Sequence, residues 1–88
     1  MTTTETYNGW TNYETWNIAL WINDDEIHYN TVLSILKSDP ETNYQTIANM
    51  FQVNGFDHTP DGVSYDDENL NIVELDDMIK DFREGHNL

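Results

Sequence analysis

The 88-residue sequence contains no cysteine, so neither a disulfide framework nor a thiolate metal site can hold it together. Glycine and proline are scarce, at four and two residues, and leave long stretches free to form regular structure. The longest unbroken apolar run, residues 18–22, is far too short to span a bilayer. Residues 1–7 contain no basic side chain and do not resemble a signal or transit peptide. We therefore expect a cytoplasmic protein without membrane contact.

Basic residues are almost absent. The chain has 17 acidic side chains and only three basic ones, Lys37, Lys80 and Arg83, which gives a formal net charge of -14. This field repels DNA, RNA and anionic membranes and attracts basic protein surfaces. Three cations are too few to hold a nucleotide, and no glycine-rich phosphate loop is present. The three histidines have no neighbouring motif that pairs a base with a nucleophile; they are His28, His58 and His86. We expect a binding protein with no enzyme activity and no cofactor.

The apolar content allows a modest core. Hydrophobic residues make up 38% of the chain and aromatic residues 12%, enough for one small domain. Three tryptophans and five tyrosines are expected to supply much of the buried area. We expect a flexible N-terminal segment over residues 1–8 and one acidic helical domain over residues 9–88.

Capping signals predict four helices. Thr11-Asn12-Tyr13-Glu14 has the form of a capping box and predicts a helix from Thr11 or Asn12 to about Asn23. Asp24 and Asp25 can cap a second helix over residues 26–38, and Asp39-Pro40 predicts the start of a third that ends before Gly55. Asn71, with Glu74 three residues later, opens a last helix that Gly85 ends. The expected fold is a mainly α, single-domain bundle of about four helices.

The connection over residues 54–69 is rich in glycine, proline and aspartate. It predicts one long acidic loop, ordered by a few apolar residues, with a short extended piece at residues 63–65. Two of its residues, Asp57 and Asp61, can cap local backbone.

The first predicted helix is apolar around most of its circumference. Tyr13, Trp16 and Leu20 share one face, whereas Trp21 lies about 140° from Trp16 at about 100° per residue. One tryptophan is therefore expected in the core and the other at a second contact. Either this helix is the centre of the bundle, or Trp21 anchors a dimer or partner interface.

The last predicted helix carries an acidic stripe. Its members recur at i, i+3, i+7 and i+10 and lie beside the apolar face; they are Glu74, Asp77, Asp81 and Glu84. Neighbours about 5–6 Å apart match the spacing of phosphates along one DNA strand at about 6–7 Å, which fits a rise of about 3.4 Å per nucleotide. Asp76 and Lys80 can pair at i, i+4 away from this stripe.

Further acidic clusters extend the negative surface. Asp66, Asp67 and Glu68 precede the stripe in sequence, and residues 24–26 form another cluster. Charge that spans the molecule favours a surface that mimics DNA. The alternative is a solvated surface whose acidity serves solubility alone.

A calcium loop is a second interpretation of the acidic loop. Five residues match positions 1, 3, 5, 6 and 12 of an EF-hand loop; they are Asp57, Thr59, Asp61, Gly62 and Glu68. Pro60 suits its position poorly, and no second EF-hand is present to pair with this one. Calcium binding is therefore the weaker alternative.

The segment over residues 7–22 resembles the opening of a group of small, uncharacterised, acidic proteins of bacteriophages, plasmids and cyanobacteria, chiefly through the run Asn12-Tyr13-Glu14-Thr15-Trp16-Asn17. The resemblance implies a context, since small acidic phage proteins often inhibit host restriction, CRISPR or transcription enzymes. Our leading hypothesis is a phage-type inhibitor that occupies a basic nucleic-acid-binding surface. The alternative is an adaptor or homodimer that uses exposed tryptophans, namely Trp10, Trp16 or Trp21.

Overall fold

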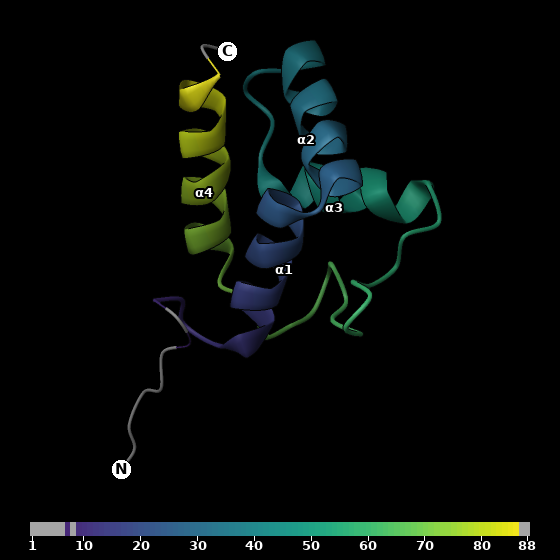
Figure 1. The fold of residues 1–88 in the computed structure, drawn as a ribbon, viewed down its shortest axis with the longest axis vertical. Coiled ribbons are helices and arrows are strands. Elements are labelled where there is room, and N and C mark those ends of the chain that lie inside the picture. The colour runs from purple at the N-terminus through teal and green to yellow at the C-terminus, as the bar shows by residue number, and fades with distance from the viewer. Residues whose placement is uncertain (1–6, 8, 87–88) are drawn as a thin grey trace.

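The computed structural model describes residue 7 and residues 9–86 of the chain. These residues form four helices: α1 (Tyr13–Asp24), α2 (Glu26–Ser38), α3 (Tyr44–Val53) and α4 (Ile72–Gly85). α1 leads directly into α2, α4 stands beside them, and α3 runs across them (Figure 1). The mainly α fold is confirmed. Most of the segment predicted to be flexible lies outside the described residues.

Each helix begins at an asparagine or aspartate whose side chain accepts a hydrogen bond from the backbone N–H three residues later; these N-caps are Asn12, Asp25, Asn43 and Asn71. The predicted start of α3 at Asp39-Pro40 is wrong. These two residues instead open a turn in which Thr42 N donates to Asp39 O at 3.1 Å. Aspartate followed by proline also suits the first two positions of a type I turn, so the signal was ambiguous.

The long connection lies along the lower edge in Figure 1 and returns the chain from α3 to α4. The predicted extended piece is present as an isolated antiparallel bridge between His58 and Ser64. Val63, Tyr65 and Leu70 enter the core from this connection, and Tyr65 is only 1% exposed. The connection is therefore part of the packed structure.

The core is mostly aliphatic. α1 contributes Ile18, Ala19 and Ile22, and α3 contributes the four residues predicted to point inward, Tyr44, Ile47, Ala48 and Phe51. None of the three tryptophans is fully buried, so the prediction that one of them lies in the core is wrong. Ile18, Ala19 and Ile22 occupy one stripe of α1 at helical spacing, and this stripe excludes Trp16 and Trp21.

None of the helices in the described ranges combines the length and the apolar character needed to cross a membrane.

Candidate functional site

The α4 helix has three distinct sides. Its apolar side is buried in the core and consists of Leu75, Met78, Ile79 and Phe82. A second, polar side holds the start of α3: Asp76 Oδ1 accepts from Tyr44 N at 2.9 Å, and Arg83 Nη1 donates to Pro40 O at 2.8 Å. The predicted Asp76–Lys80 pair is not formed: among the described residues no Lys or Arg side chain makes a close contact with a carboxylate. Asp76 is a structural acceptor.

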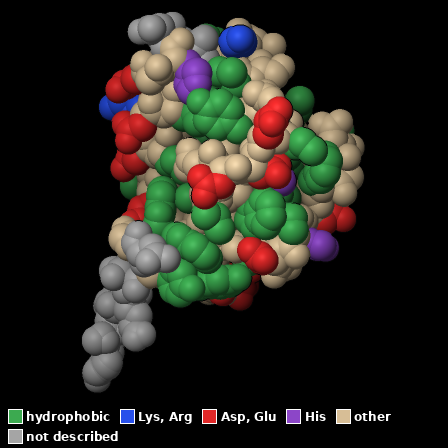
Figure 2. All heavy atoms as spheres, viewed as in Figure 1, with side chains coloured by type: hydrophobic (Ala, Val, Ile, Leu, Met, Phe, Trp, Pro, Cys, Tyr) green, Lys and Arg blue, Asp and Glu red, His purple; other side chains and the backbone are tan. Residues whose placement is uncertain are grey.

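The third side of α4 carries the predicted acidic stripe. Asp77, Asp81 and Glu84 are exposed, whereas Glu74 is half-buried and its Oε1 accepts from Thr11 N at 2.9 Å. We call Asp77, Asp81 and Glu84 the α4 acidic column. Acidic side chains run down the left edge of Figure 2, over α4. The structure thus brings the predicted stripe together, but one of its four members is committed to the fold.

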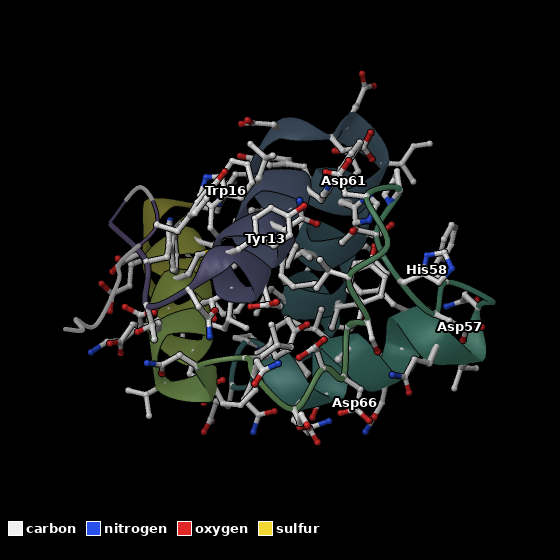
Figure 3. All side chains as sticks on the ribbon, turned by 90° about the horizontal axis from the view of Figure 1, so that it is seen from below. Tyr13, Trp16, Asp57, His58, Asp61 and Asp66 are labelled. Atoms are coloured by element: carbon white, nitrogen blue, oxygen red, sulfur yellow. The ribbon has the colours of Figure 1, made fainter. Side chains whose placement is uncertain are left out.

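The acidic residues upstream of α4 are placed differently. Asp66 and Glu68 are exposed, and Asp67 Oδ1 accepts from Asn69 N at 2.7 Å. Asp66 follows Tyr65, whose carbonyl is held by the Tyr44 hydroxyl of α3, so Asp66 lies near α3 (Figure 3). These residues enlarge the negative surface without continuing the α4 acidic column.

A groove of about 550 Å³ adjoins the column, between α4 and the α1–α2 pair. Glu74, Asp77 and Asp81 lie on its α4 wall. Its aromatic lining comes from three separate segments and consists of Trp10, Tyr29, Phe82 and His86. Carboxylates beside aromatic rings suit a lysine or arginine side chain, which gains both charge pairing and a cation–π contact. We call this the acidic groove.

His86 makes two hydrogen bonds in this groove. His86 Nδ1 bonds to Phe82 O at 2.8 Å and its Nε2 bonds to the Tyr29 hydroxyl at 2.6 Å. The His86 ring also stacks on Phe82, with ring centroids 4.7 Å apart. Sequence reasoning missed this groove because its aromatic residues are far apart in the chain and follow no common motif.

The predicted calcium-loop residues hold the connection to α1 instead. Thr59 Oγ1 donates to Asn17 Oδ1 at 2.6 Å, and Asp61 Oδ2 accepts from Asn17 Nδ2 at 2.8 Å and from Trp21 Nε1 at 2.9 Å. The bond from Asn17, with that from Trp21, lowers the pKa of Asp61. Within the described ranges no three His, Asp or Glu side chains are grouped as metal ligands. The arrangement does not form an EF-hand loop.

These contacts also change the role of Trp21. Its indole N–H donates to Asp61 and its ring is half-buried, so Trp21 anchors the connection while part of its ring stays accessible.

His28 is buried at 6% exposure. Its Nδ1 lies 2.7 Å from Asp25 Oδ2 and its Nε2 bonds to the Tyr65 hydroxyl. The hydrogen bond from His28 lowers the pKa of Asp25, and burial raises the pKa of Tyr65 to about 12. Burial also raises the pKa of Tyr44. Both ring nitrogens of His28 are hydrogen-bonded, one to Asp25 and one to Tyr65. We call these three residues the His28 row; it fastens the connection to α2. His58, by contrast, is exposed.

Aromatic side chains gather on the outer side of α1. The ring centroid of Trp16 lies 4.7 Å from that of Tyr7 and 5.6 Å from that of Tyr13. Tyr7 is 41% and Tyr13 is 38% exposed. Figure 3 shows Tyr13 and Trp16 on the same helix, and Figure 2 shows apolar atoms gathered over this part of α1. We call these three residues the α1 aromatic cluster.

The sequence run that carries the family resemblance joins α1 to α4. Thr15 Oγ1 donates to Asn12 Oδ1 at 2.6 Å and accepts from Asn71 N at 3.0 Å. Asn71 Nδ2 in turn donates to Thr11 Oγ1 at 2.9 Å. Each helix start therefore satisfies polar groups of the other, which gives these residues a structural role.

A model described as a family of unknown function (DUF7249) matches residues 3–85 of the chain. No curated protein and no solved structure matches it.

Proposed function

Since the chain belongs to this family of unknown function, we propose its function from its surface: it is an inhibitor of the phage type that occupies the basic nucleic-acid-binding surface of a cytoplasmic enzyme. It acts as a DNA mimic by binding and performs no reaction of its own.

The α4 acidic column carries this proposal. Its three carboxylates are exposed, and no Lys or Arg forms a close ion pair with a carboxylate in the part of the chain that the structure describes. With a net charge of -14, the molecule attracts a basic surface over a long range at low salt. Consecutive members of the column are separated along the helix like the acidic groups of a nucleic-acid backbone.

The acidic groove supplies a contact that charge alone would not. A lysine or arginine of the partner can lie between Asp77 or Asp81 and the rings of Trp10 and Tyr29. A central basic anchor of this kind is expected to contribute more binding energy than the exposed rim of charges around it.

The test compares two double variants with the same change in net charge. Asp77→Lys with Asp81→Lys reverses the column, whereas Glu41→Lys with Asp57→Lys reverses two exposed carboxylates elsewhere. Tagged proteins are used to capture partners from nuclease-treated bacterial lysate at about 0.05 M and about 0.5 M salt. The captured enzyme is then assayed for DNA or RNA binding with each variant present.

We expect wild type and the control variant to retain a nucleic-acid-binding enzyme at low salt and to block its nucleic-acid binding. The column variant should bind at least about 100-fold more weakly, at about tenfold for each reversed charge. Equal binding by both variants, or a complex indifferent to salt, would rule the proposal out.

The α1 aromatic cluster supports a second candidate, an adaptor that binds through apolar contacts. Tyr7 and Tyr13 are exposed and pack around Trp16, which gives a preformed aromatic surface. Trp16→Ala should then abolish capture at every salt concentration while helical content, followed by circular dichroism, stays unchanged. A captured partner unaffected by Trp16→Ala would exclude this candidate.

A further inference from the structure

A second groove, without charge, lies between α2 and α3. It has a volume of about 510 Å³ and is lined by Ile27, Asn30, Thr31, Ser34, Ile35, Met50 and Asn54. A hollow of about 330 Å³ continues it and shares Ser34, Ile35 and Met50, and Asp39 is the one charged side chain among the residues that line this hollow. We call the two together the neutral groove. In a molecule with 17 acidic residues, a groove so poor in charge needs explanation.

Apolar side chains are unusually exposed along this groove. Ile27 is 66% exposed and Met50 is 43% exposed, and Val53, one turn further along α3, is 81% exposed. Exposed aliphatic side chains gathered on one face are typical of a contact surface.

We propose that the neutral groove is the contact between two copies of this chain. Two molecules of charge -14 repel each other, and the repulsion is weakest where few carboxylates lie between them; Asp39 is the one carboxylate that lines the neutral groove. The exposed side chains of Ile27 and Met50 can pack against the same side chains of a second copy, whereas a basic partner would gain little from them. In a two-fold contact the same surface is used twice, so Ile27 of each copy would be buried near Met50 of the other.

The dimer leaves the acidic groove open. Tyr29 lines the acidic groove and lies about 160° around α2 from Ile27, at about 100° per residue. Each copy therefore keeps its α4 acidic column available, and the dimer presents two acidic faces. This inference does not rest on the proposed function, because self-association and binding of a basic partner use opposite sides of α2.

Analytical ultracentrifugation of the full chain tests the proposal. Self-association should strengthen with salt, because salt screens the repulsion between the copies: the Debye length falls from about 14 Å at 0.05 M to about 4 Å at 0.5 M, in line with about 10 Å at 0.1 M. Binding to a basic partner should weaken over the same range. The opposite signs keep the two processes distinguishable.

A matched pair of variants locates the contact. Ile27→Glu places a charge in the neutral groove, whereas Val73→Glu makes the same kind of change at another exposed aliphatic residue, 71% exposed, in the first turn of α4. Ile27→Glu should raise the dimer dissociation constant by about 100-fold, because each dimer loses two buried side chains. Val73→Glu should leave it within about threefold, and circular dichroism should show both variants folded.

A wild-type protein that stays monomeric at all salt and protein concentrations would overturn the proposal. So would a dimer that salt dissociates, or one that both variants weaken equally.

Discussion

The connection over residues 54–71 and the outer side of α4 are both acidic, but the connection uses one of its carboxylates to hold another helix, while its Asp66 and Glu68 stay exposed. Asp61 of the connection is held by Asn17 and Trp21, whereas Asp77 and Asp81 of α4 face solvent. The difference comes from the hydrogen-bond donors near each carboxylate. α1 places an amide N–H and an indole N–H beside Asp61, so that this carboxylate is held. Acidity in this sequence therefore has two uses, and only the second is available to a partner.

We expect the largest effect on stability from a substitution of Asn17, which is fully buried and binds both Thr59 and Asp61. Asn17→Ala leaves the Thr59 hydroxyl buried without its acceptor and should lower the free energy of unfolding by about 3 kcal/mol. Asn49→Ala, at an exposed position of α3, should change it by less than about 0.5 kcal/mol. Urea unfolding of both variants provides the measurement. An equal effect would mean that the connection is not held by this contact.

The His28 row predicts a pH dependence. Burial raises the pKa of Tyr65 to about 12 from about 10 in the unfolded chain. A raised folded-state pKa gives stability that is full below about pH 10 and is lost as the pH rises towards 12. Tyr44, whose pKa is also raised by burial, adds to the loss.

Tyr65→Phe should sharpen this test. It removes the hydroxyl that His28 needs and should cost about 1–2 kcal/mol at neutral pH. The variant should then lose less stability than wild type between about pH 9 and about pH 11, measured by urea unfolding. Tyr13→Phe, at an exposed ring, serves as the control. An unchanged alkaline profile in Tyr65→Phe would contradict the assignment.

The smallest change in unfolding free energy that we predict is the difference between substitutions of two adjacent residues of α4. Asp76 accepts from Tyr44 N in the first turn of α3, whereas Asp77 is exposed. Asp76→Ala should lower the free energy of unfolding by about 1 kcal/mol relative to Asp77→Ala. Both changes remove one carboxylate and improve helix propensity equally, so the difference measures the contact. Thermal unfolding at low salt gives it directly, and identical midpoints would show that Asp76 is as free as Asp77.

The sequence predicted the helices through their local signals. Capping residues and apolar spacing gave α1, α2 and α4 to within a residue or two, and the stripe on α4 followed from helical periodicity alone. The start of α3 failed because Asp39-Pro40 suits a turn as well as a helix start.

The polar interior could not be predicted. Asn and Thr usually lie at the surface and His is intermediate. Each of Asn17, Thr59 and His28 is buried here because a partner distant in sequence satisfies it. The acidic groove escaped prediction for the same reason, since only the fold brings Trp10, Tyr29 and Phe82 together. The sequence pattern predicts which side of a helix is buried, but not which distant residues pack against that side.

The reciprocal contact between Thr15 and Asn71 has a consequence for how the chain acquires its structure. It joins residues 56 positions apart, so this contact cannot form until residue 71 has been synthesised, although Asn12 can cap α1 before then. The contact between the starts of α1 and α4 therefore forms late in synthesis. A ribosome-bound chain that stops before residue 71 should leave α1 open to proteases, however well the intervening helices have formed.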